Sequence, residues 1–107
     1  MTIEATNIVS QCKSAVSQLY GERLAKLILF GSYARGEEKD ASDIDFLVVL
    51  NDKKISPFTE IERINDKVYD LMIQCGKIIS FVPTTSDSFS NSPNMLYSLI
   101  KKEGREV

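Results

Sequence analysis

The segment FGSYARGEEKDASDIDFLVVL, from Phe30 to Leu50, constrains the fold of this chain more than any other stretch. It ends in Phe46–Leu50, the longest uninterrupted apolar run of the sequence, and its composition predicts a buried strand over 43–50. Two acids, Asp43 and Asp45, stand at the mouth of that strand. Two like charges held together cost stability unless something positive lies between them, so this pair indicates a binding site.

Apolar spacing predicts two longer helices. The first starts near Thr2 or Thr6 and ends near Tyr20, because Gly21 follows its apolar stripe. The second is opened by Ser56-Pro57, carries an apolar stripe from Phe58 to Cys75 and is closed by Gly76. It is the clearest helix of the chain.

Shorter elements fill the remaining sequence. Compact apolar segments predict strands over 27–30 and 77–82, with Pro83 stopping the second, and a polar loop over 83–92 follows. Ser92-Pro93 then opens a last helix that ends at Gly104 and buries Met95, Leu96, Leu99 and Ile100. The order helix, strand, strand, helix, strand, helix predicts an α/β fold: a small sheet packed with helices in a single domain over 1–107.

Composition narrows the possible functions. The 13 Lys and Arg against 15 Asp and Glu give a formal charge of −2, which disfavours binding to nucleic acid or to an anionic membrane. No apolar run has the length of a membrane span and the N-terminus lacks a signal-peptide pattern, so we expect a cytoplasmic protein. The absence of histidine excludes Ser-His-Asp triads, Cys-His dyads and His-ligated zinc. Cys12 and Cys75 fall on helix stripes and are expected to be buried free thiols.

The spacing of Asp43 and Asp45 predicts a metal site. Side chains two residues apart on a strand leave the same face, with Cα atoms roughly 6–7 Å apart. Paired carboxylates are hard oxygen ligands that suit Mg²⁺, which binds a few carboxylates together with substrate phosphates. The pair alone also fits an ordinary solvated strand end.

A phosphate-binding turn is predicted directly after the first strand. Gly31-Ser32 precedes a short helical segment, so backbone N–H groups and the Ser32 hydroxyl would face an anion that glycine allows to approach closely. Arg35 adds a fixed positive charge. Taken singly, the Gly-Ser pair is also typical of a turn, and Arg35 could equally be a surface residue paired with Glu37 or Glu38.

The conjunction of these pieces resembles a known signature. GSYARG, then SDIDFLVV, with ten residues between Gly-Ser and Asp-x-Asp, is similar to the motif of the DNA polymerase β-like nucleotidyltransferase superfamily. The chain resembles the minimal nucleotidyltransferase (MNT) domains of that superfamily, over essentially its whole length. The resemblance implies a polymerase β-like fold with a small mixed β-sheet.

The resemblance also implies an activity and its residues. The expected reaction transfers a nucleoside monophosphate, with AMP favoured, from a Mg²⁺-NTP to a hydroxyl acceptor. Gly31 and Ser32 would hold the β- and γ-phosphates, with Arg35 structural or phosphate-facing. Asp43 and Asp45 would be catalytic and would ligate the Mg²⁺ ions, two of them by analogy, with ATP or another NTP as substrate.

One position departs from the family pattern. Members that catalyse transfer carry a third carboxylate on the later strand, and in GKIISFV the residue at that place is Ser80. A serine cannot serve as a general base, because its pKa lies near that of water. Asp87, Glu60 or Glu62 could supply the missing carboxylate, as could the acceptor or a partner.

Three hypotheses about function follow. The first is an enzyme that modifies a partner protein, similar to the antitoxin half of two-gene toxin–antitoxin systems whose partner is a helical HEPN-type protein. The second is a nucleotide-binding or protein-interaction module of the same fold whose chemistry has decayed, for which Ser80 is the main support. The third, an aminoglycoside-modifying type of transferase, is weakened because those enzymes resemble longer chains.

The closing helix is a candidate interaction surface. Tyr97 and Met95 are side chains favoured at protein interfaces, although ordinary core packing explains them equally well. The sequence leaves homo-oligomerisation open.

Overall fold

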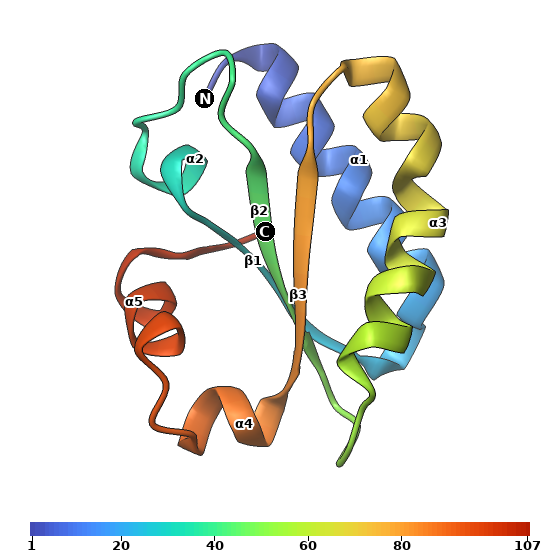
Figure 1. The fold of residues 1–107 in the computed structure, drawn as a ribbon, viewed down its shortest axis with the longest axis vertical. Coiled ribbons are helices and arrows are strands. Elements are labelled where there is room, and N and C mark those ends of the chain that lie inside the picture. Colours follow the sequence, from blue (N-terminus) through green and yellow to red (C-terminus); the bar gives the residue numbers. More distant parts are fainter.

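The computed structural model describes all residues from 1 to 107 as a sheet between helices (Figure 1). Two helices, α1 and α3, are long, and the strands β1, β2 and β3 have seven residues each. The elements in chain order are α1 (Ile3–Tyr20), a 3₁₀ turn (Gly21–Arg23), β1 (Leu24–Phe30), α2 (Ser32–Arg35), β2 (Ile44–Leu50), α3 (Pro57–Cys75), β3 (Ile79–Thr85), α4 (Ser86–Asn91), α5 (Met95–Glu103) and β4 (Arg105–Glu106).

The sheet has the order β3-β2-β1-β4 and is mixed. β1 pairs antiparallel with β2 and with β4, whereas β2 and β3 run parallel. The predicted α/β class with a small mixed sheet is confirmed. The two-residue strand β4 was not predicted, because Arg105-Glu106 carries no apolar signal and only its pairing with β1 defines it.

The two faces of the sheet are covered unequally (Figure 1). α1 and α3 lie on one face over the larger core cluster, which includes Phe46 and Val48 of β2. α4 and α5 lie on the other face over a five-residue cluster: Ile28, Leu47, Val49, Phe89 and Ile100. β2 is therefore buried on both faces from Phe46 onward, while Asp43, just before it, is exposed. Near Asp43 and Asp45, the sheet face that α4 and α5 cover is therefore more exposed than it is farther along β2.

The predicted ends of the long helices are confirmed. Thr2 caps α1, and its hydroxyl oxygen accepts a hydrogen bond from the Ala5 amide at 3.0 Å. α1 ends at Tyr20, and α3 runs from Pro57 to Cys75, as the sequence predicts. Cys12 is buried and Cys75 half-buried, both as free thiols, and burial raises the pKa of Cys12 to about 12.

The predicted end of β3 at Pro83 is wrong. The strand continues through Pro83 to Thr85, because β3 lies at the edge of the sheet, where a proline is tolerated. The predicted loop over 83–92 contains a further helix, α4. Thr85 caps it, accepting a hydrogen bond from the Ser88 amide at 3.1 Å, and Phe89 anchors it in the core.

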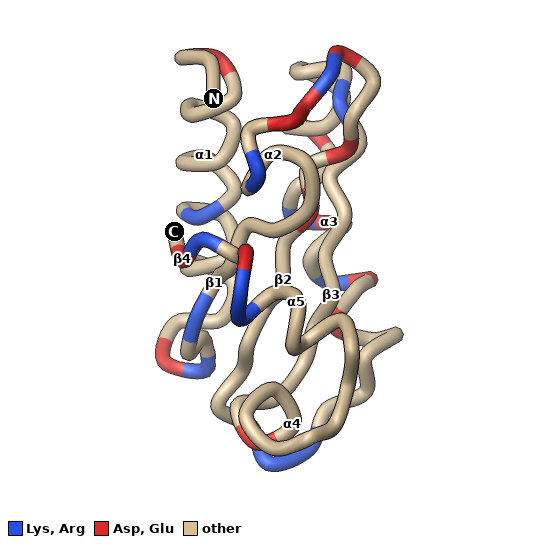
Figure 2. Tube along the Cα trace, turned by 90° about the vertical axis from the view of Figure 1, so that its left-hand side faces the viewer, with Lys and Arg blue, Asp and Glu red and all other residues tan.

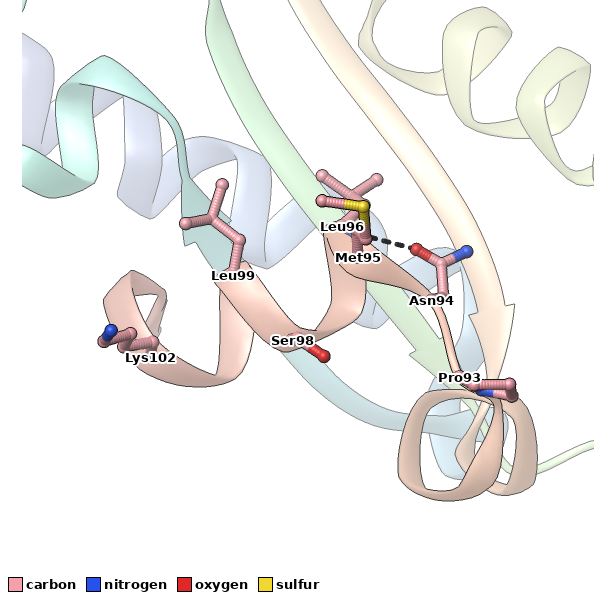
Figure 3. A pocket seen from close by; sticks show the side chains of 7 residues that line it. All are labelled: Pro93, Asn94, Met95, Leu96, Ser98, Leu99 and Lys102. Atoms are coloured by element: carbon pink, nitrogen blue, oxygen red, sulfur yellow. Dashed lines mark hydrogen bonds between the residues drawn. The ribbon is translucent and has the colours of Figure 1, made fainter.

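The predicted buried side of α5 is wrong except for Ile100. Met95 is 91 % exposed and Leu99 45 % exposed, and with Leu96 they line an open hollow of about 620 Å³ on the helix (Figure 3). Tyr97 instead turns inward, and its hydroxyl donates a hydrogen bond to Thr84 Oγ1 at 2.8 Å. Apolar spacing identifies a stripe on a helix but does not say which neighbour covers it. The helix begins at Met95, with Asn94 as its cap, rather than at Ser92-Pro93.

No helix of the structure combines the length and the apolar character that crossing a membrane requires.

Candidate functional site

The two acids predicted to bind metal lie where β2 begins. Asp43 comes just before the strand, Ile44 is fully buried, and Asp45 is half-buried. Asp45 is the register partner of Phe30 on β1 and of Ser80 on β3. The central strand therefore places this carboxylate between the turn that follows β1 and the beginning of β3.

Gly31 packs against the carboxylate of Asp45. A Cβ atom at Gly31 would lie 2.5 Å from Asp45 Oδ2, which is closer than real contacts allow. The backbone of Gly31 has φ 76° and ψ −156°, a conformation that is essentially restricted to glycine. Both the space and the backbone therefore require glycine at this position, and the two predicted halves of the site are in contact here.

The predicted short helix after Gly31 is confirmed as α2. Its first turn closes on the Gly31 carbonyl, which accepts hydrogen bonds from the amides of Ala34 and Arg35 at 3.1 and 3.2 Å. Tyr33 and Ala34 are buried and hold the turn on the core. The first backbone amides of a helix have no acceptor within that helix. The amides of Ser32 and Tyr33, at the beginning of α2, can therefore donate hydrogen bonds to an anion.

The electrostatics of Asp45 favour a bound cation. Burial raises the pKa of Asp45, the nearby charge of Asp43 raises it further, and Arg35 opposes the shift. A carboxylate that is partly desolvated beside a second carboxylate gains from a cation placed between the two. No group of three or more Asp, Glu, Cys or His side chains in the structure could hold a metal ion, so two carboxylates are the protein ligands available at this site. That donor set fits Mg²⁺, which completes its shell with water and substrate oxygens.

Arg35 is held by glutamates. Its Nε donates to Glu37 Oε2 at 3.1 Å, and its Nη1 lies 3.7 Å from Glu103 Oε2 of α5. The sequence left open that Arg35 is a surface residue paired with Glu37 or Glu38, and the structure shows the pair with Glu37. The contact with Glu103 was not predicted, because only the tertiary structure brings the end of α5 close to α2. Figure 2 shows other charged residues of both signs gathered in the loop between α2 and β2. A phosphate-facing role for Arg35 remains a prediction.

The predicted substitutes for the third carboxylate lie at the other end of the sheet. β2 and β3 are parallel strands of seven residues, so their two ends are about 20 Å apart. Asp87 lies in α4, beyond the far end of β3, and accepts a hydrogen bond from Asn91 at 2.8 Å. Glu60, near the beginning of α3, accepts one from the Tyr20 hydroxyl at 3.0 Å, and Glu62 lies in the following turn. Asp87, Glu60 and Glu62 were possible substitutes, and their positions leave an acceptor or a partner as the other source of this carboxylate.

Ser80 is therefore the residue that faces this end of the site from β3. It is paired with Asp45 in the parallel ladder, so their side chains leave the same face of the sheet. Its side chain is half-buried. The position at which this sequence departs from the family motif therefore lies next to Asp45.

Comparison with protein families identifies a nucleotidyltransferase domain. A family model described as a nucleotidyltransferase domain matches residues 9–102. Two relatives from Methanocaldococcus jannaschii are named as candidate protein adenylyltransferases. One is 29% identical over 98 residues, covering 91% of both chains, and the other is 31% identical over 75 residues, covering 66% of this chain and 76% of its own length.

Two solved structures share the fold. A crystal structure of a toxin–antitoxin with AMP-PNP superposes with a TM-score of 0.63 at 19% identity, covering 98% of this chain and 72% of that one. A candidate nucleotidyltransferase from Sulfolobus solfataricus gives a TM-score of 0.60 at 20% identity, covering 96% and 75%. At these identities the likeness concerns the fold.

Proposed function

This chain belongs to the nucleotidyltransferase domain family and is a nucleotidyltransferase, and from that premise we propose that it transfers AMP from Mg²⁺-ATP to a hydroxyl group of a partner protein. The observation that carries the proposal is the contact between Gly31 and Asp45. It joins a turn suited to phosphates to a carboxylate pair suited to Mg²⁺, which are the two parts that nucleotidyl transfer requires.

The residues take the following roles. Gly31 and the first turn of α2, with Ser32, hold the β- and γ-phosphates. Asp43 and Asp45 hold the magnesium, which when bound neutralises charge on the phosphates. Arg35, kept in place by Glu37 and Glu103, contributes a positive charge beside Asp45 and orients the turn. Together the residues 1–107 act as one minimal nucleotidyltransferase domain.

AMP and a protein acceptor are the specific parts of this proposal. The relatives from M. jannaschii are named as candidate protein adenylyltransferases, which favours AMP and a protein. The toxin–antitoxin structure with AMP-PNP supports an adenine nucleotide and a second protein. We propose a helical protein of the HEPN type as that partner, and a cytoplasmic location for the reaction.

The test is transfer to a co-expressed partner. The protein encoded next to this one is expressed with the wild type, with Asp43→Asn, with Asp45→Asn or alone, and its intact mass is measured. We expect the mass of AMP to be added to the neighbour only with the wild type. An unmodified neighbour, together with Mg²⁺-ATP binding by calorimetry, would instead indicate a nucleotide-binding module whose transfer chemistry is lost.

A further inference from the structure

The strand order separates two sides of Asp45. On one side lies β1, whose Phe30 pairs with Asp45 and leads into Gly31 and Ser32. On the other side lies β3, whose Ser80 pairs with Asp45. Gly31 and Ser80 therefore flank the same carboxylate from opposite directions.

Together with the proposed phosphate site, this arrangement gives a direction for the reaction. In phosphoryl transfer the attacking and leaving oxygens lie roughly in line on opposite sides of the phosphorus. If the β- and γ-phosphates rest on Gly31 and Ser32, the pyrophosphate leaves on the β1 side. The acceptor hydroxyl then approaches from the β3 side, where Ser80 is the residue of this chain next to Asp45.

The Ser80 hydroxyl is available for reaction. Ser80 is half-buried, and its hydroxyl takes part in none of the side-chain hydrogen bonds of the structure, of which those nearest in the sequence involve Lys77 and Ser86. Three serine hydroxyls elsewhere in the chain are engaged: Ser42 Oγ accepts from the Lys39 amide, Thr59 donates to Ser56 Oγ, and Ser86 donates to the Leu50 carbonyl. What distinguishes Ser80 is its place beside Asp45. A serine at this position cannot act as the general base that the family's third carboxylate provides, but its hydroxyl oxygen can act as a nucleophile.

We propose that Ser80 is itself an acceptor, so that the chain attaches one AMP to its own site when no partner is bound. The inference rests on the proposed function. Ser80 Oγ attacks the α-phosphorus of ATP, and a new Oγ–P ester bond forms. The bond from the α-phosphorus to the oxygen that bridges to the β-phosphate breaks, and pyrophosphate leaves with that electron pair. The hydroxyl proton passes to solvent water.

The product is self-limiting. An AMP group on Ser80 places an anion and a nucleoside beside Asp43 and Asp45, where the next nucleotide would bind. Each chain is therefore modified once and then no longer binds Mg²⁺-ATP. A docked partner whose hydroxyl takes the β3 side prevents this by competing with Ser80.

The experiment uses the full chain without a partner. Purified wild type, Ser80→Ala, Ser80→Thr and, as a matched control, Ser98→Ala on the exposed outer side of α5 are incubated with Mg²⁺-ATP, followed by intact-mass and peptide mapping. We expect one AMP per chain on the peptide with residue 80 in wild type, Ser80→Thr and Ser98→Ala, and none in Ser80→Ala. The rate should not change with protein concentration, because the step is intramolecular.

A second readout follows binding. ATP with a methylene group between the α- and β-phosphates should raise the Tm of unmodified chain without forming an adduct, and should no longer raise it after modification. An unmodified wild type, an adduct that persists in Ser80→Ala, or a rate that rises with protein concentration overturns the proposal. If Ser80→Ala and the wild type both transfer AMP to the co-expressed neighbour while neither modifies itself, self-transfer alone fails. If the wild type shows no Mg²⁺-dependent nucleotide binding, the proposed function fails as well.

Discussion

The backbone of Gly31 packs directly against the carboxylate of Asp45, leaving no space for a Cβ atom at position 31. The contact joins the turn after β1 to the central strand of the sheet. A substitution in the phosphate-binding turn should therefore displace the Asp45 carboxylate, and a substitution of Asp45 should alter the turn.

Gly31→Ala should therefore destabilise the protein and abolish nucleotide binding. The substitution strains the backbone, at a cost of about 1–3 kcal/mol, and pushes the Asp45 carboxylate from its position. The measurements are the free energy of unfolding and the Tm shift given by Mg²⁺-ATP. Gly36→Ala is the control, because Gly36 also has positive φ, at 71°, but its Cβ would meet nothing within 4 Å. If Gly36→Ala loses nucleotide binding as completely as Gly31→Ala, the contact with Asp45 is not the cause.

Asp43→Asn and Asp45→Asn should each remove the Tm increase that Mg²⁺-ATP gives the wild type. Loss of one of two carboxylates leaves the metal with too few protein ligands, and stabilisation by a ligand disappears with its affinity. Calorimetry with Mg²⁺-ATP at millimolar concentration checks this. Asp66→Asn, an exposed acid on α3, should bind like the wild type. Nucleotide binding that survives both substitutions would show that the metal site lies elsewhere.

Asp45 should contribute stability to the metal-free protein that increases as the pH falls through the pKa of its carboxyl group. Burial and Asp43 raise this pKa above the ordinary value of 3.8, so the folded state takes up a proton before the unfolded chain does. This contribution grows as the pH falls from neutrality toward 3.8. In chemical unfolding across that range, the difference in unfolding free energy between the wild type and Asp45→Asn should shift in favour of the wild type as the pH falls. Identical pH profiles would contradict the raised pKa.

Ser80→Asp should increase Mg²⁺ affinity and lower the stability of the metal-free protein. Register places the new carboxylate beside Asp45, where it adds both a ligand and a repulsive charge. Magnesium titration and the Tm with and without Mg²⁺ measure the two effects, and Ser80→Asn separates charge from size.

Transfer to the partner should rise in Ser80→Asp and stay unchanged in Asp87→Asn, because Asp87 lies at the far end of the sheet. Transfer lost in Asp87→Asn would refute the placement argued for the site.

Tyr97→Phe should cost about 1 kcal/mol of unfolding free energy without changing self-association. It removes the hydrogen bond to the buried Thr84 hydroxyl, while the ring keeps its edge contact with Phe89. Urea unfolding measures the cost, and sedimentation measures association. Tyr69→Phe is the matched control, because Tyr69 is 60 % exposed. Equal stability of the two variants would contradict a stabilising role for the Tyr97 hydrogen bond. The sequence alone fitted core packing and a protein interface equally well for Tyr97.

The sequence by itself determined the elements whose signals are local. Helical spacing defined the two long helices, with Gly21 closing the first and Pro57 opening the second, and a compact apolar run defined β2; the structure then chose Thr2 over Thr6 as the cap of α1. The spacing of Gly31-Ser32 and Asp43-x-Asp45 identified the parts of the site, because backbone conformation and side-chain direction over a few residues follow from residue type. The tertiary structure decided what depends on long-range register: that Asp45 lies between Gly31 and Ser80, that Glu60 and Asp87 are remote, and that Tyr97 rather than Met95 faces inward. Strand order and helix orientation arise from the packing of distant segments, and no local pattern in the sequence encodes them.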